Sequence, residues 1–358
     1  MNVILALFVL VISFYFLSKI VDEIFIKSLD NICNYLKLPP SVAGATFMAA
    51  GTSAPELSTT LFALFLVGAN PATGLGTVVG SAIFQILVVV GFTAIVKTSY
   101  LNWKPVLRDG IFYTISILIL IFVVKDKAIT FKESALMVGT YFLYIFVLIL
   151  WTKLVDESKE PDPLEMVEKG VGKESKSVFG KLLSPINKIF KLIPDVEKYP
   201  KWTVAVFILS LIAIAFGSYW LVIGGEAFAL GIGVPASVVA LTILAGGTSV
   251  PELISSAIVA KQGRGDMAIS NAIGSNIFDI LISLGFPLLI YTGVNGDLTN
   301  IDGENINSSI ILLFVTMIMV LLLLASQKFK IGKAVGAILI AGYVVYVIAA
   351  YTGLLAGS

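Results

Sequence analysis

The sequence lacks histidine altogether and holds a single cysteine, Cys33, among its 358 residues. The missing histidine removes the commonest proton relay, zinc ligand and catalytic base, which argues against a serine hydrolase. One cysteine excludes an internal disulfide and a cysteine-rich metal site. Only 13% of the residues are charged and the net charge is +1, so no basic surface suits nucleic acid. We therefore expect neither an enzyme, nor a bound cofactor, nor a nucleic-acid partner.

Hydrophobic residues, by contrast, make up 58% of the chain and lie in long continuous runs. Runs such as Asn2–Leu17, Trp202–Ile223 and Ser308–Leu324 approach or reach the roughly 20 residues that cross the hydrocarbon core of a bilayer. They do not alternate with polar residues, as the strands of a membrane barrel would. The sequence predicts an all-α polytopic membrane protein surrounded by lipid.

We expect ten transmembrane helices, five on each side of one long polar stretch. The predicted spans are 2–18, 41–67, 71–96, 108–124, 133–152, 202–224, 236–260, 268–292, 306–326 and 331–354. The chain would thus divide into a first transmembrane repeat (1–152), a cytoplasmic loop (153–201) and a second transmembrane repeat (202–358). Part of that loop, 178–193, alternates apolar and lysine positions, and could lie on the inner leaflet or be a solvated linker.

The distribution of positive charge predicts the orientation of these helices. If the N-terminus is outside, 21 of the 24 lysines and arginines lie in or directly beside the inner loops. Only Lys125, Lys127 and Lys132 lie in outer loops. Because inner loops carry an excess of positive charge, we expect both termini outside and loop 153–201 in the cytoplasm.

Two motifs occur once in each half. Gly51–Leu57 reads GTSAPEL and Gly247–Leu253 reads GTSVPEL, 196 positions later; Gly80–Leu87 (GSAIFQIL) and Gly274–Leu281 (GSNIFDIL) are 194 positions apart. Five helices per half is an odd number, so the second half is expected upside down relative to the first. Such an inverted repeat brings the two copies of each motif together near the middle of the membrane.

The first motif combines a helix break with an acid. Pro55 and Pro251 have no N–H, so each frees the carbonyl four residues earlier. A freed carbonyl in the hydrocarbon is tolerated where it lines a polar cavity or an ion. Glu56 and Glu252 come directly after these prolines, and a charged residue at this depth costs roughly 2.5–3.5 kcal/mol. A duplicated acidic break therefore indicates a cation transporter.

The neighbouring side chains complete a set of oxygen ligands. Hydroxyls flank each glutamate at Thr52, Ser53, Thr248 and Ser249. In the second motif, Ser81 and Ser275 lie four residues before Gln85 and Asp279, on the same helix face. The paired glycines, Gly80 and Gly274, are expected to let helices approach closely. Oxygen ligands suit calcium, whose charge two carboxylates neutralise, and also sodium. Asp279 opposite neutral Gln85 makes the charge of the site asymmetric.

These motifs resemble the two α-repeats of the sodium/calcium exchanger family, within the calcium/cation antiporter superfamily. GSNIFDI is closest to the potassium-dependent branch and to prokaryotic members, and the resemblance covers nearly the whole chain except 153–201. It implies antiport of sodium against calcium by alternating access, and leaves the use of potassium open. Since one chain carries both repeats, we expect it to function as a monomer.

The resemblance also implies roles for individual residues. Glu56 and Glu252 would coordinate calcium together with the carbonyls of Thr52 and Thr248, and Asp279 would lie at the central layer and be tied to potassium use. The residues implied for sodium are Ser53, Ser249, Ser81, Ser275 and the carbonyls of Ala49 and Ala245. Gln85 departs from the family pattern, which usually has asparagine there, and this puts ion stoichiometry or affinity in question.

Several alternatives stay open at this stage. A proton-coupled calcium antiporter of the same fold could use the same buried acids as proton carriers, and broken helices also build cation channels. The hydroxyls could bond back to their own helices instead of binding ions. Glu226 and Asp30, 196 positions apart and near predicted helix ends, could be structural or shape the field of an ion vestibule. Asn276 lies on another face and is expected to be structural.

Overall fold

The computed structural model describes residues 2–25, 27–28, 31–32, 35, 49–65, 71–101, 103–154, 194–196, 198–234, 236–261, 265–299 and 306–352. Cys33, Asp30 and the proposed interfacial segment 178–193 lie outside these ranges, as does most of loop 153–201.

Helices form nearly all of the described chain, and some are unbroken while others change geometry midway. The unbroken ones are α1 (Val3–Ile20), α8 (Trp103–Val124), α9 (Phe131–Leu154), α13 (Thr203–Ile232), α19 (Ile306–Ser326) and α20 (Lys333–Tyr351). A π-helical turn, η1 (Val21–Phe25), extends α1, and a 3₁₀ turn, η4 (Pro200–Trp202), precedes α13.

The remaining helical segments carry the repeated motifs. One comprises α4 (Ala49–Thr52) and α5 (Ala54–Phe65), and its counterpart comprises α14 (Ala236–Val239), η5 (Ala240–Leu244), α15 (Ala245–Thr248) and α16 (Val250–Lys261). The other pair begins with a segment that comprises α6 (Pro71–Phe84), η3 (Gln85–Val89) and α7 (Val90–Val96). Its counterpart comprises α17 (Gly265–Phe278), η6 (Asp279–Leu284) and α18 (Gly285–Asn295). The second motif of each half thus marks a π-helical turn, a feature that often occurs at functional sites.

Seven helical segments in the described ranges are long and apolar enough to cross a membrane. They coincide with the predicted spans that begin at 71, 108, 133, 202, 268, 306 and 331. The other three predicted ranges hold α1, whose apolar stretch is shorter, and the two segments that are interrupted at Ser53 and Ser249. The described part is therefore a largely helical, polytopic membrane protein.

One predicted boundary was wrong by two turns. The expected span 202–224 continues as α13 to Ile232 and ends at Gly233, whose positive φ of 69° closes the helix in the left-handed conformation that glycine adopts easily. Glu226, which the predicted boundary placed just outside the helix, therefore lies within it, six residues before its last residue. Composition alone missed this, because Gly224 and Gly225 look like helix breakers.

Element bounds recur between the two halves. α5 and α16 are both 12 residues long and begin 196 positions apart; α6 and α17 are both 14 residues long and begin 194 positions apart. The short strands β1 (Ser99–Tyr100) and β4 (Lys330–Ile331) pair antiparallel, as do β2 (Ala128–Ile129) and β3 (Leu298–Thr299). Each pair joins a connection of the first half to one of the second.

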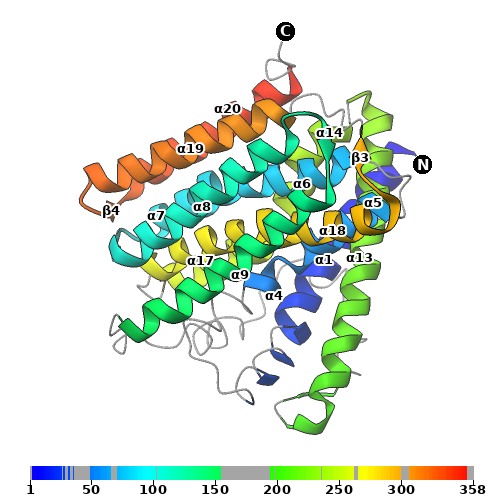
Figure 1. Ribbon diagram of the computed structural model, residues 1–358, viewed down its shortest axis with the longest axis horizontal. Coiled ribbons are helices and arrows are strands. Elements are labelled where there is room, and N and C mark those ends of the chain that lie inside the picture. The colour runs from blue at the N-terminus through cyan, green and yellow to red at the C-terminus, as the bar shows by residue number, and fades with distance from the viewer. Residues whose placement is uncertain are drawn as a thin grey trace.

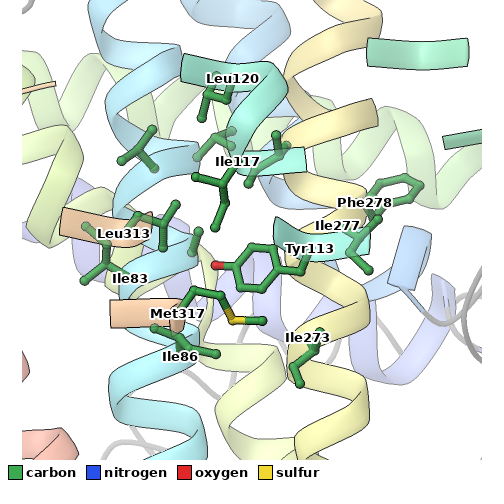
Figure 2. Packing of buried hydrophobic residues seen from close by; sticks show 14 of the residues in the cluster. Ile83, Ile86, Tyr113, Ile117, Leu120, Ile273, Ile277, Phe278, Leu313 and Met317 are labelled. Atoms are coloured by element: carbon green, nitrogen blue, oxygen red, sulfur yellow. The ribbon is translucent and has the colours of Figure 1, made fainter. Parts of the chain in front are cut away.

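Two hydrophobic clusters hold the helices together. The larger one lies between α6, α8, α17 and α19, where Tyr113 and Ile117 of α8 pack among Ile83, Ile277 and Met317 (Figure 2). The smaller one lies mainly between α1 and α13, with Leu10, Leu17, Ile214 and Leu221, and also takes in Ala54, Val239 and Leu244 of neighbouring segments. In Figure 1, α1 and α13 run side by side and steeply across the direction of α9, α17 and α19. The pair therefore has its own apolar contact, separate from the main core.

Candidate functional site

The candidate site lies where the two broken segments and the two π-helical turns meet. α5 contacts η6, and α6 contacts both η5 and α15. Twelve residues were predicted for this site, and all are at most 1% exposed: Ala49, Thr52, Ser53, Glu56, Ser81, Gln85, Ala245, Thr248, Ser249, Glu252, Ser275 and Asp279. Three of them are acids, so three carboxyl groups are enclosed within the helices.

Glu56 lies at the centre of a hydroxyl network that joins the two halves. Its Oε1 accepts hydrogen bonds from Ser81 Oγ at 3.1 Å and from Ser249 Oγ at 3.3 Å. The two serine hydroxyls lie 2.7 Å apart. Residues from α5, from α6 and from the break before α16 therefore converge on one carboxylate oxygen, although Ser249 is 193 positions away in the chain.

Asp279 and Gln85, at the same position of their repeats, contact each other directly. Gln85 Nε2 donates to Asp279 Oδ2 at 3.0 Å and to Ser81 Oγ at 3.2 Å. The prediction that Gln85 shares a helix face with Ser81 is thus confirmed. In this arrangement the amide nitrogen faces the acid, and among the described residues the amide oxygen of Gln85 has no hydrogen-bond partner. That oxygen is available to a cation.

The breaks at Ser53 and Ser249 also interact across the two halves. The Thr248 side chain interacts with the carboxylate of Glu56, and the Thr52 side chain interacts with that of Glu252. Glu252 lies within electrostatic range of both Glu56 and Asp279. The two copies of the first motif therefore face each other, and the threonine of each copy interacts with the glutamate of the other copy.

The carbonyls of Ala49 and Ala245 are already hydrogen-bonded in this arrangement. Ala49 accepts from the Ser53 N–H at 2.9 Å and from Thr52 Oγ1 at 3.5 Å; Ala245 accepts from the Ser249 N–H at 3.2 Å and from Thr248 Oγ1 at 3.1 Å. The back-bonding hydroxyl considered from the sequence is thus observed for both threonines. Since a carbonyl oxygen has two lone pairs, coordination of a cation there requires a threonine hydroxyl to turn away.

One ligand-type residue escaped the sequence analysis. Ser283 Oγ lies 3.3 Å from Asp279 Oδ1 and 3.4 Å from the carbonyl of Ser53. It follows Asp279 by four residues, the spacing that was used for Ser275 and Asp279, and so could have been found. It was missed because Val89 occupies the equivalent position of the first repeat, and the search followed what both repeats share.

Two further expectations concern the second motif. A Cβ added at Gly80 would meet the backbone of Leu241, so the expected close approach is real there. For Gly274 it stays a prediction: among the described residues a Cβ there would meet nothing within 4 Å, and Ala45, the repeat equivalent of Leu241, lies outside the described ranges. Asn276 points away from the acids, donating to Tyr113 Oη at 3.1 Å and to the Ala82 carbonyl at 3.4 Å. The expected structural role of Asn276 fits these bonds.

The site has the oxygen chemistry of a hard cation. In the described ranges, histidine, cysteine, aspartate and glutamate side chains alone do not form a group of three placed to hold a metal ion. Further ligands must therefore be hydroxyl, amide and backbone oxygens, which surround the acids here. Buried Ser275 Oγ, without a hydrogen-bond partner in the described part of the chain, is one such oxygen. Calcium and sodium accept such ligands, whereas softer metals prefer nitrogen or sulfur.

Comparison with known proteins gives a consistent result. The family model described as sodium/calcium exchanger protein matches residues 5–150 and 202–352. Sodium/potassium/calcium exchanger 2 of Gallus gallus is 28% identical over 97% of this chain and 77% of its own length. Sodium/potassium/calcium exchanger 5 of Homo sapiens is 29% identical over 96% of this chain and 82% of its own length.

Solved structures share the fold. Crystals of the sodium-calcium exchanger NCX_Mj soaked with Na⁺ and Sr²⁺ match 97% of this chain and 98% of theirs, with a TM-score of 0.59 and 24% sequence identity. A crystal soaked with Na⁺ and Ca²⁺ gives a TM-score of 0.58 over 98% of this chain and 99% of its own.

Proposed function

The chain belongs to the sodium/calcium exchanger family, and we propose that it is a secondary antiporter that moves sodium one way and calcium the other by alternating access. The observation that carries the proposal is the enclosed cluster of Glu56, Glu252 and Asp279, lined by hydroxyls from both repeats. Three carboxylates in the apolar interior are costly without a bound cation. One calcium or several sodium ions offset the same charge, so the two ions compete for one site, as antiport requires.

The proposed architecture is ten transmembrane helices in two inverted five-helix repeats, at 1–152 and 202–358, joined by loop 153–201. Contacts between elements support it, because they occur in equivalent pairs. α7 packs on α20 as α18 packs on α9, and α6 packs on α19 as α17 packs on α8. Residue bounds that recur at offsets of 196 and 194 give the same relation within single elements.

The proposed orientation has both termini outside and loop 153–201 in the cytoplasm. The strand pairs are compatible with it: β1 and β4 both lie in connections placed inside, and β2 and β3 both lie in connections placed outside. Strands can pair only if they lie on the same side of the membrane, so the pairings support the alternation of the helices. The positive charge of the inner connections supports the direction.

In the proposed site, Glu56 and Glu252 bind calcium with the carbonyls of Thr52 and Thr248. Sodium uses Ser53, Ser249, Ser81, Ser275 and the carbonyls of Ala49 and Ala245. Asp279, with Gln85 and Ser283 as neighbours, is assigned to the central layer and to potassium use. The relatives named for potassium support this last assignment. The α1–α13 pair, with its separate apolar contact, is proposed to move against the remaining helices, in a single chain acting as a monomer.

The test is radioactive calcium uptake into proteoliposomes loaded with sodium and diluted into sodium-free buffer, with and without potassium. Uptake that requires internal sodium supports the proposal, and stimulation by potassium supports the role of Asp279. Uptake driven only by an imposed pH gradient would refute sodium coupling and identify a calcium/proton antiporter. Flux that neither gradient drives would point to a channel.

A further inference from the structure

Glu226 is an acid within a membrane-spanning helix, yet it is not part of the central cluster. It lies in the apolar span Pro200–Ile232, and its side chain is half-buried. No lysine or arginine in the described ranges forms an ion pair with it. An ionisable group inside a span marks a functional site by default, because such a position is costly for a charge.

The hydrogen-bond partner of Glu226 leads toward the central site. Thr73 Oγ1 of α6 donates to Glu226 Oε1 at 3.4 Å. Thr73, Thr77 and Ser81 follow at intervals of four, so their hydroxyls share one face of α6. All three are at most 1% exposed, and Thr77 Oγ1 donates to the Thr73 carbonyl at 2.8 Å. Ser81 then reaches Glu56, about 12 Å along the helix from Thr73 at 1.5 Å per residue.

The neighbour of Glu226 places α13 close to η5, in its own repeat, as well. A Cβ at Gly225 would collide with the side chain of Leu244, which precedes the predicted ligand Ala245. Glu226 thus lies where α13 passes both α6 and η5. This point is near the end of α13 and the beginning of α6, both of which face outward in the proposed topology.

We infer that Glu226 is a low-affinity cation-binding residue at the outer mouth of the ion pathway, which attracts calcium from the outer solution toward the line of hydroxyls on α6. The inference rests on the proposed function. One carboxylate and one hydroxyl bind a hard cation weakly, so the ion is released inward and not retained. A charge at the entrance of an ion pathway raises the local concentration of the ion and its rate of association.

The experiment compares the two faces of the membrane. Calcium fluxes driven by sodium are measured in right-side-out and inside-out vesicles from the same cells, for the parent chain and for Glu226→Gln. The variant should raise the outer half-saturating calcium concentration about three- to tenfold, more at low ionic strength. The inner half-saturating concentration and the maximal rate should not change. Glu226→Asp should restore most of the outer affinity.

Two variants separate this role from simpler ones. Asp297→Asn removes an exposed acid next to β3, on the same outer side, and should leave the outer affinity unchanged. Thr73→Val keeps the charge and removes the hydroxyl, and should raise the outer half-saturating concentration about twofold, which provides a test if Glu226→Gln does not assemble.

Three results would contradict the inference about Glu226 or the proposed function. An unchanged outer affinity in Glu226→Gln, or equal changes on both faces, would overturn the inference. Glu226 would then serve only as a structural hydrogen-bond partner that joins α13 to α6. An Asp297→Asn effect as large as that of Glu226→Gln would also overturn it. If the parent chain shows no sodium-driven calcium flux, the proposed function itself fails.

Discussion

Replacing Gly80 by alanine should damage this protein, whereas the same replacement at Gly274, the equivalent glycine of the second repeat, should not. A Cβ at Gly80 would lie 2.6 Å from the carbonyl carbon of Leu241 and 2.7 Å from Cβ of Ala245. Carbon atoms pack at about 3.5–4.0 Å, so α6 and η5 would have to separate by about 1 Å. Among the residues that the structure describes, a Cβ at Gly274 meets nothing within 4 Å.

The two replacements should change the free energy of unfolding in opposite directions. Overpacking costs typically about 1–3 kcal/mol, and the upper end applies because the clash involves backbone. Alanine recovers roughly 0.5–1 kcal/mol over glycine in a helix. Gly80→Ala should therefore lower the free energy of unfolding by about 2 kcal/mol, and Gly274→Ala should raise it by roughly 0.5–1 kcal/mol. Since Ala245 must move with η5, Gly80→Ala should also weaken sodium-dependent calcium uptake.

The assay is thermal unfolding in detergent followed by tryptophan fluorescence, with calcium uptake by the same preparations in proteoliposomes. The two glycines begin the same Gly-Ser pair, so a rule based on the motif alone predicts equal effects. Equal shifts in the unfolding temperature, or a larger loss for Gly274→Ala, would refute the packing argument.

Three further predictions concern the central site. Glu56→Gln should abolish calcium uptake, because the variant removes a charge that balances the ion; robust sodium-driven uptake would refute the assignment. Asp279→Asn should reduce the stimulation by potassium more than calcium binding, measured as uptake over a potassium titration; an unchanged potassium response would contradict this. Ser249→Ala removes a hydrogen bond to Glu56 and should raise the half-saturating calcium concentration about threefold to tenfold, in line with about 0.5–1.5 kcal/mol per bond, whereas an unchanged value would indicate a hydroxyl outside the ligand set.

The sequence was sufficient to predict where the helices break and which acids lie beside the breaks. Glu56 and Glu252 stand out because an acid within an apolar run is rare, and Pro55 and Pro251 because proline cannot continue the hydrogen bonds of a helix. Breaks in the helices at Ser53 and Ser249 confirm this local prediction. Local chemistry acts within a few residues, so a single pass along the chain can detect it.

The contacts between distant segments were decided only by the tertiary structure. Ser249 reaches Glu56 and Asn276 reaches Ala82 across more than 190 positions, and neither pairing follows from spacing within one helix. Gly80 and Gly274 begin the same Gly-Ser pair, yet among the described residues only Gly80 has the backbone of another segment packed against it. What the sequence determined by itself is therefore which residues are proposed for the site, through residue chemistry and helix periodicity. Which oxygens face one another depends on how the helices pack, and that is a property of the whole chain.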